Sequence, residues 1–227
     1  MSAYVPLWVK SNHSFLEGAS FPEELVDRAH ALGLPALAIT DRDGVYGLVR
    51  AHMRAKELGI RLVTGAELAL DIEGEQHRII ALAKSRLGYA SLCRALSLGH
   101  ARCEKGLSLV ELDDLREARD LFFLCSSPAA LRTLHAGHGP SSLFALCARH
   151  LDDREKPRER ALRAAAAELG VQAVGANEVL YHDKVRRPLQ DVLACIRGGK
   201  ALSEAGHTIR RNAEHDLKPF DESSRLF

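Results

Sequence analysis

The sequence predicts an α/β protein in which a parallel sheet is covered by helices and closes, or nearly closes, into a β/α barrel. Segments typical of strands and of helices alternate about six times along the chain, which is the pattern of a parallel sheet with helical crossovers. Most strand-like segments are continuous apolar runs, as expected for strands covered on both faces. Because such crossovers are right-handed, a barrel is a natural outcome.

The first half of the chain begins this alternation with a well-marked helix at residues 20–34. Ser20 and Glu23 have capping-box spacing, Pro22 lies in the first turn, and Gly33 ends the apolar periodicity. The other elements predicted in this half are strands at 35–41, 60–70 and 77–85 and helices at 47–59 and 89–101.

The second half continues the same pattern. The elements predicted there are helices at 107–118, 128–137, 156–170 and 186–199 and strands at 120–126 and 171–181. Residues 141–151 carry an apolar run that suits either state, and we favour a strand. The charged residues 150–160 are typical of a solvated loop that leads into a helix.

The composition is that of an ordinary globular protein and excludes several classes. The chain is 46% hydrophobic and 27% charged, with a formal net charge of +1, so its overall charge gives no argument for nucleic-acid binding. Its five scattered cysteines form no C-x-x-C pair, which argues against a disulfide framework or a zinc knuckle. Neither a signal peptide nor a membrane span is recognisable, and we expect a cytoplasmic location.

Acidic residues and histidines follow several of the predicted strands. The opening apolar stretch leads to residues 10–18 with His13, and later strands lead to Asp41, to Glu67, and to Glu178 with His182. Since the carboxyl ends of parallel strands share one rim, these side chains could hold divalent metals. Each also has a plainer reading. Asp41 could cap the following turn and helix, Glu67 could be a solvated charge, and single histidines are more often packing or surface residues.

Five stretches, in order, carry a resemblance to a known family: "SNHSFLEGAS", "ALAITDRDGVYGLVRAH", "GAEL", "ANEVLYH" and "RRPLQDVLACIRGG". They resemble the polymerase-and-histidinol-phosphatase (PHP) domain of bacterial C-family DNA polymerases, the polymerase III α-subunit class, and look most like its error-prone branch. The resemblance implies a distorted seven-stranded, TIM-barrel-like β/α barrel. It also implies that residues 1–200 form this domain and that 201–227 begin the connection to a polymerase body outside the chain.

Active members of the family hydrolyse phosphate esters with a trinuclear metal centre, and the resemblance implies that this centre is degraded here. The first His-x-His pair falls on Trp8 and Lys10, the histidine of the Thr-Asp-His motif falls on Arg42, and the last histidine falls on Leu180. The acidic positions are kept; they are Glu17, Asp41, Glu67 and Glu178. His13 and His182 lie near the motifs but not on the expected positions.

The replacements share a physical direction. Lys10 and Arg42 carry positive charge and cannot donate a lone pair to a metal, while Trp8 and Leu180 are apolar. We therefore expect salt bridges in place of the metal centre, and no cofactor in this chain. A residual zinc or manganese ion on Asp41, Glu67 and His13 or His182 stays open. Magnesium is expected only in the polymerase body.

These observations leave three functional hypotheses. The first is a structural PHP domain of an error-prone DNA polymerase, a nucleotidyltransferase for DNA-directed, damage-tolerant synthesis in DNA replication and DNA repair after DNA damage. Its partners would be the rest of the polymerase chain, DNA through the full-length protein and other repair or replication proteins, with no membrane. The second is a stand-alone metal-dependent phosphoesterase or exonuclease. The third is a binding module that holds phosphate groups through Lys10, Arg42, Arg186 and Arg187.

Overall fold

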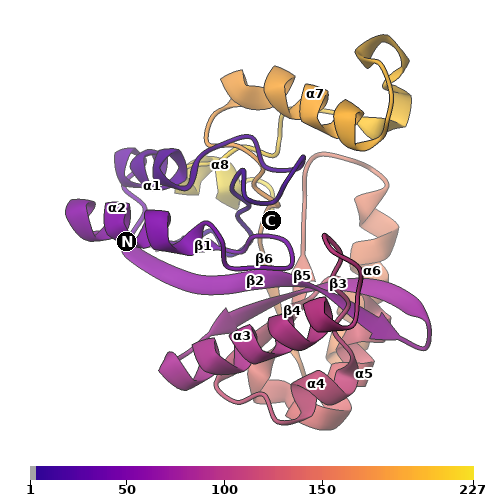
Figure 1. Ribbon diagram of the computed structural model, residues 1–227. Coiled ribbons are helices and arrows are strands. Elements are labelled where there is room, and N and C mark those ends of the chain that lie inside the picture. Colours follow the sequence, from indigo (N-terminus) through magenta and orange to yellow (C-terminus); the bar gives the residue numbers. More distant parts are fainter. Residues whose placement is uncertain (1–3) are drawn as a thin grey trace.

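The computed structural model describes residues 4–227, and a curled six-stranded sheet forms the centre of that part of the chain (Figure 1). The strands lie in sequence order across the sheet. They are β1 (Ala36–Ile39), β2 (Arg61–Ile72), β3 (Glu75–Ala83), β4 (Leu121–Cys125), β5 (Leu143–Cys147) and β6 (Gln172–Gly175).

Helices cover the sheet and its rims. They are α1 (Pro22–Ala31), α2 (Leu48–Leu58), α3 (Arg86–Ala101), α4 (Leu112–Arg116), α5 (Pro128–His138), α6 (Glu155–Glu168), α7 (Arg187–Arg197) and α8 (Phe220–Ser224). Figure 1 shows α7 at the top of the view, away from α3, α4 and α5 at the bottom. No helix within residues 4–227 is long and apolar enough to cross a membrane.

Four hydrophobic clusters lie in the described residues, and three of them hold these layers together. The largest fills the space between the sheet and α3 to α6, with Leu68, Leu92 and Phe123 among its fully buried members. A second lies under α1 and α2, where Leu25 and Leu37 are fully buried. The third lines the inner side of the curled sheet and faces the candidate site described below. Burial of apolar surface on both sides of the sheet is the main stabilising contribution.

The expectation of an all-parallel sheet is wrong at β2 and β3. The pairs β1–β2, β4–β5 and β5–β6 are parallel, but β2 pairs antiparallel with β3, and β3 pairs antiparallel with β4. The cause is a two-residue turn at Glu73 and Gly74, whose φ angles are 54° and 84°. Two successive positive φ angles give the turn that joins a tight hairpin. An Asn-Gly or Asp-Gly pair would have signalled this turn, whereas Glu-Gly did not.

The described residues contain six strands rather than the seven expected. Residues 6–10 run between β1 and residues 176–179 without forming a regular strand. The amide of Thr40 donates to the carbonyl of Val9 (2.8 Å), and the amides of Lys10 and Val179 donate to the carbonyls of Val179 and Trp8 (both 2.9 Å). Only the isolated bridge between Val9 and Val179 has strand geometry there. This irregular segment carries Lys10 to the inner side of the sheet.

Several element boundaries also differ from those predicted. Only Leu112–Arg116 of the helix predicted at 107–118 is helical, because Val110 instead pairs with Leu70 of β2. The strand predicted at 171–181 is confined to β6, and the ambiguous residues 141–151 contain β5, as favoured.

The start of α1 differs as well. It is capped by Glu24, which accepts from the amide of Phe21 (2.9 Å), and not by the pair Ser20 and Glu23. The hydroxyl of Ser20 accepts instead from the amide of His182 (2.8 Å).

Residues 201–227 pack against the rest of the domain. The amide of Leu180 donates to the carbonyl of His215 (2.8 Å), and the amide of Leu217 donates to the carbonyl of Tyr181 (3.1 Å). Leu217 is buried in the cluster under α1 and α2. The domain boundary at residue 200 stays a prediction.

We predict that Gly18→Ala destabilises the protein by about 1–3 kcal/mol, the usual cost of overpacking. A Cβ at Gly18 would lie 2.1 Å from the carbonyl oxygen of Ser11, and backbone atoms cannot rotate away. Gly137→Ala is the matched control, because a Cβ there meets nothing within 4 Å and Gly137 lies inside α5. Helix propensity should make that control neutral or stabilising. Equal urea midpoints for the two variants would contradict this reading of Gly18.

Candidate functional site

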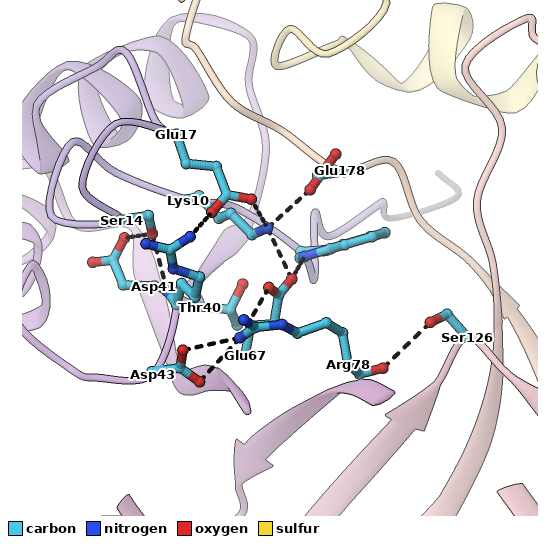
Figure 2. A network of polar contacts seen from close by, with 12 residues as sticks. Lys10, Ser14, Glu17, Thr40, Asp41, Asp43, Glu67, Arg78, Ser126 and Glu178 are labelled. Atoms are coloured by element: carbon cyan, nitrogen blue, oxygen red, sulfur yellow. Dashed lines mark hydrogen bonds and ion pairs between the residues drawn. The ribbon is translucent and has the colours of Figure 1, made fainter. Parts of the chain in front are cut away.

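The candidate site is built around the side chain of Lys10, which is 2% exposed and points into a group of three carboxylates. Its Nζ lies 2.7 Å from Oε1 of Glu17, 2.9 Å from Oε2 of Glu67 and 2.8 Å from Oε1 of Glu178. Figure 2 shows these side chains converging from three separate parts of the chain. An ammonium group has three protons to donate, so each carboxylate can accept one charge-assisted hydrogen bond.

The sequence suggested that Glu67 follows the end of a strand, but the structure places it within β2. The parallel pairing with β1 stops at Thr64, and β2 continues beyond it as the partner of β3. Glu67 therefore still lies just past the carboxyl end of β1. The indole Nε1 of Trp8 donates to its Oε2 (2.7 Å), the same oxygen that contacts Lys10.

Arginines surround the cluster on its outer side. Arg42 and Arg197 lie 3.2 and 3.3 Å from Oε2 of Glu17. Arg210 lies 2.6 Å from Oε2 of Glu178. The carboxylates are thus held between one buried cation and several half-exposed ones.

A second ion pair lies next to Glu67. Arg78 donates to both carboxylate oxygens of Asp43 (3.0 Å each) and lies 3.9 Å from Oε1 of Glu67 (Figure 2). The amide of Ala69 also donates to Asp43 (3.0 Å). This pair fixes the turn after β1 against the start of the β2–β3 hairpin.

The pKa values follow from this arrangement. Burial by itself lowers the pKa of Lys10, but attraction to Glu178, Glu67 and Glu17 outweighs burial and raises that pKa above its ordinary value. Burial raises the pKa of Glu17, and the Lys10 charge outweighs it, so the net direction is down. Lys10 and Arg210 likewise outweigh burial at Glu178 and hold its pKa well below the usual range.

Glu67 behaves differently from the other two carboxyl groups. It is 3% exposed, and its burial raises its pKa by more than the Lys10 charge lowers it, while Glu178 and Glu17 add repulsion. The pKa of Glu67 is therefore raised. Of the three carboxyl groups around Lys10, that of Glu67 is therefore the easiest to protonate.

Asp41 lies beside the cluster and organises the backbone. Its carboxylate is fully buried and accepts from the amide of Ser11 (2.7 Å), the hydroxyl of Ser14 (2.8 Å) and the amide of Gly47 (3.2 Å). Gly47 is the residue before α2. Asp41 therefore joins the loop that follows Lys10 to the residue before α2.

The two histidines proposed as residual ligands differ in their contacts. Nδ1 of His182 lies 2.8 Å from the Ser20 hydroxyl and 3.8 Å from Glu24. The backbone amide of His13 donates to the Ser11 hydroxyl (3.2 Å), whereas its ring Nε2 is buried and has no hydrogen-bond partner among the described residues. Leu180 is fully buried against Ala19 and Tyr181.

The candidate phosphate-binding residues are also engaged within the chain. Lys10 is enclosed by carboxylates, and Arg42 pairs with Glu17. Arg186 contacts Glu24, and Arg187 lies 3.7 Å from Asp191. Phosphate binding by these residues stays a prediction, and it would require them to exchange their present partners.

A cavity of about 790 Å³ opens beside the cluster. Trp8, Glu17 and Glu178 line the part nearest Lys10, and Arg158 and Arg211 line the outer part. The opening lies between β5, α6, α7 and the segment after residue 206.

Sequence reasoning missed the residues that complete the site. Arg78, Arg197, Arg210 and His215 all contact the cluster carboxylates, with Nδ1 of His215 3.4 Å from Oε2 of Glu178. Arg197 lies within the stretch "RRPLQDVLACIRGG" but was not singled out there, the other three lie outside the quoted stretches, and Arg210 reaches Glu178 across 32 positions of sequence. The one available signal was that buried carboxylates need more counter-charge than a single lysine provides.

The donors present do not fit a metal centre. The three glutamates already accept from Lys10, and the neighbouring side chains of Trp8 and Leu180 offer no lone pair. Within residues 4–227, no group of three or more His, Cys, Asp or Glu side chains is placed to hold a metal ion. We therefore derive no reaction step through a metal.

The sheet is a curled half-barrel of six strands covered by helices, with acidic side chains gathered past its strand ends. The chain belongs to the PHP domain family, whose profile matches residues 7–170. The chain is 41% identical over 238 aligned positions to an error-prone DNA polymerase of Anaeromyxobacter sp. (strain K). This alignment covers 99% of this chain and 21% of that protein. It is 39% identical to an error-prone DNA polymerase of Brucella abortus biovar 1 (strain 9-941), over 100% of this chain and 22% of that protein.

The chain thus spans about a fifth of the length of the polymerases it matches. Among solved structures, an amidohydrolase from Chromobacterium violaceum with bound sulfate and no metal superposes with a TM-score of 0.55. That alignment covers 79% of this chain and 88% of the other at 16% identity, and so supports the fold alone. The fold is therefore shared with a solved protein of very different sequence.

We predict that Lys10→Met lowers the free energy of unfolding by about 3–5 kcal/mol at pH 7, because it leaves buried carboxylates without their central cation. Urea unfolding followed by circular dichroism measures this. The matched control is Arg132→Met, which removes an exposed ion pair with Glu168 (3.0 Å) and should cost no more than about 1 kcal/mol. Similar losses of unfolding free energy in the two variants would show that the Lys10 cluster stabilises the fold no more than an exposed ion pair does.

The pKa directions also predict how stability depends on pH. The lowered pKa values of Glu17 and Glu178 stabilise the fold fully above their unfolded value of about 4.3, and this contribution is lost as the pH falls through the folded values. The raised pKa of Glu67 acts oppositely, since its protonation favours the fold. We expect the unfolding free energy to stay level or rise between pH 7 and about 5 and to fall below about 4.

Glu178→Gln should flatten the acid-side loss, and Glu67→Gln should remove any rise near pH 5. Urea unfolding at a series of pH values provides the measurement. Stability of the unsubstituted protein that keeps rising down to pH 3 would be incompatible with these directions.

Proposed function

We propose that this chain is the PHP domain of an error-prone DNA polymerase and that it acts as a structural domain without metal-dependent hydrolysis. The observation that carries the proposal is the Lys10 ammonium, which lies 2.7–2.9 Å from Glu17, Glu67 and Glu178. Identities of 41% and 39% over nearly the whole chain support the polymerase assignment.

The chemistry of lysine supports the absence of hydrolysis. Phosphoester hydrolysis at a metal centre needs ligands with free lone pairs and a water whose pKa the metal lowers. A protonated ammonium neutralises carboxylates as a metal would, but it has no open coordination position and activates no water. The raised pKa of Lys10 keeps it protonated at neutral pH, so it does not serve as a general base.

The wider role follows from the relatives. DNA-directed, damage-tolerant synthesis would be performed by a polymerase body outside these residues, and magnesium and DNA would bind there. The partner of this domain would be that body, within a cytoplasmic replication and repair protein. We also infer that residues 6–10 take the place of the seventh barrel strand, because they hydrogen bond to β1 on one side and to Val179 on the other.

We predict that the purified chain, dialysed against zinc or manganese, retains only substoichiometric metal by plasma emission spectroscopy. It should also show no hydrolysis of a phosphodiester or of single-stranded DNA above buffer. The positive control restores histidine at the replaced positions, as Trp8→His, Lys10→His, Arg42→His and Leu180→His in one chain. That variant supplies lone-pair donors beside Glu17, Glu67 and Glu178, and it should retain metal if it folds.

Stoichiometric metal in the unsubstituted chain, together with turnover that a chelator abolishes, would overturn the structural role and favour a phosphoesterase. Circular dichroism of the four-histidine variant shows whether its fold is intact. Single Lys10→His serves as the second variant if the combined one does not fold.

A further inference from the structure

We propose that the outward face of α7 is the surface on which the body of the polymerase docks; this inference rests on the proposed function. Four side chains define this face, here called the α7 stripe. They are Val185, Leu189, Val192 and Ile196, which are 75%, 42%, 39% and 58% exposed. Leu189, Val192 and Ile196 lie along one side of α7 by their spacings of three and four residues, and Val185 lies in the short 3-10 turn (Lys184–Arg186) that precedes the helix.

The helix carries more apolar surface than its own packing uses. On its inward side, Gln190 and Cys195 are buried, and Leu193 packs against Leu180 and Tyr181. The α7 stripe is therefore a second apolar face on a helix that already has a buried one. Helices that are apolar on all sides belong in interiors, and contiguous exposed apolar surface marks interaction sites.

The charges around the stripe indicate the chemistry of the partner. Lys200 lies exposed just past the end of the helix, whereas Lys184 lies 3.8 Å from Glu214 and Arg197 lies 3.3 Å from Glu17. The acidic residue of the helix, Asp191, lies 3.7 Å from Arg187 and is therefore neutralised within α7. A matching partner surface would be apolar at its centre and acidic at its border.

The identity of the occupant follows from the size of the relatives. This chain corresponds to 21–22% of each matched polymerase, so about four-fifths of such a protein lies outside the aligned segment. A domain held in a fixed position within that chain needs an apolar contact with the remainder. The α7 stripe is an exposed apolar face that could make such a contact.

Another exposed apolar pair, Val49 and Met53 on α2, provides a comparison. The residues that follow each of them, Arg50 and Arg54, pair with Glu23 and Asp27 of α1 at 2.5 Å. Ion pairs across this face are typical of a solvated surface. We therefore assign docking to α7 and use α2 as the control.

The test is cysteine footprinting of two proteins. The first is this 227-residue chain, and the second is a chimera in which the chain replaces the matching segment of the Anaeromyxobacter sp. (strain K) polymerase. Ile196→Cys and Val49→Cys are each labelled with a maleimide, and peptide mass spectrometry separates them from the native cysteines. We expect labelling of Ile196→Cys to slow by about tenfold or more in the chimera, because a covered thiol reacts only when the contact opens.

Labelling of Val49→Cys should be equal in both proteins. Equal labelling of Ile196→Cys in both would overturn the docking proposal. A labelling rate of Ile196→Cys in the short chain that falls as the protein concentration rises would also overturn the proposal, and it would identify a second copy of the chain as the occupant. A second variant, Val192→Glu with Ile196→Glu, should lower the thermal midpoint of the chimera and leave that of the short chain unchanged.

The same chimera is assayed for nucleotide incorporation on primed DNA, so that the two proposals fail separately. Incorporation without protection of residue 196 refutes docking at α7 and leaves the proposed function standing. Loss of incorporation relative to the parent polymerase, with residue 196 protected, counts against the proposed function and leaves the docking surface supported.

Discussion

The interaction on which the rest of the structure depends is the buried ammonium of Lys10 among three glutamates. Glu17 lies in the loop before α1, Glu67 lies in β2 and Glu178 follows β6. A single amine therefore joins parts of the chain that are up to 168 positions apart. Gathering three buried carboxylates without a cation would cost several kcal/mol for each charge. The Lys10 side chain removes most of that cost and fixes the position of residues 6–10, which otherwise have little regular pairing.

The Lys10 ammonium neutralises the three glutamates without supplying the chemistry of a metal ion. A divalent ion would neutralise the acids and also polarise substrate and water. The ammonium supplies only the neutralisation, and Arg42, Arg197 and Arg210 complete it from the outer side. Trp8 contributes an indole N–H to Glu67, which satisfies a carboxylate oxygen that would otherwise be buried with fewer partners. The site is thus a compact ion network whose role is to hold the rim of the curled sheet together.

Much of this could be predicted from the sequence, and the failures have identifiable causes. Helix boundaries such as Gly59 and the short apolar strands were readable because local propensity and burial agree there. The antiparallel β2–β3 hairpin was missed because Glu73 takes a left-handed conformation that its residue type does not signal. The roles of Lys10 and Glu17 came from a family motif, since composition and periodicity alone do not mark a lysine as buried.

The partners of Glu178 could not be found in the same way. Arg210 and His215 lie in a stretch without a motif and reach the site only through the path of the folded chain. Long-range pairing of charges depends on tertiary structure, which periodicity does not encode.

The most direct test of the Lys10 cluster is anomalous diffraction from crystals grown with manganese. We expect continuous side-chain density for Lys10 between Glu17, Glu67 and Glu178, and no anomalous peak among those carboxylates. Manganese peaks coordinated by these glutamates, with the lysine side chain turned away, would contradict the central role of the ammonium.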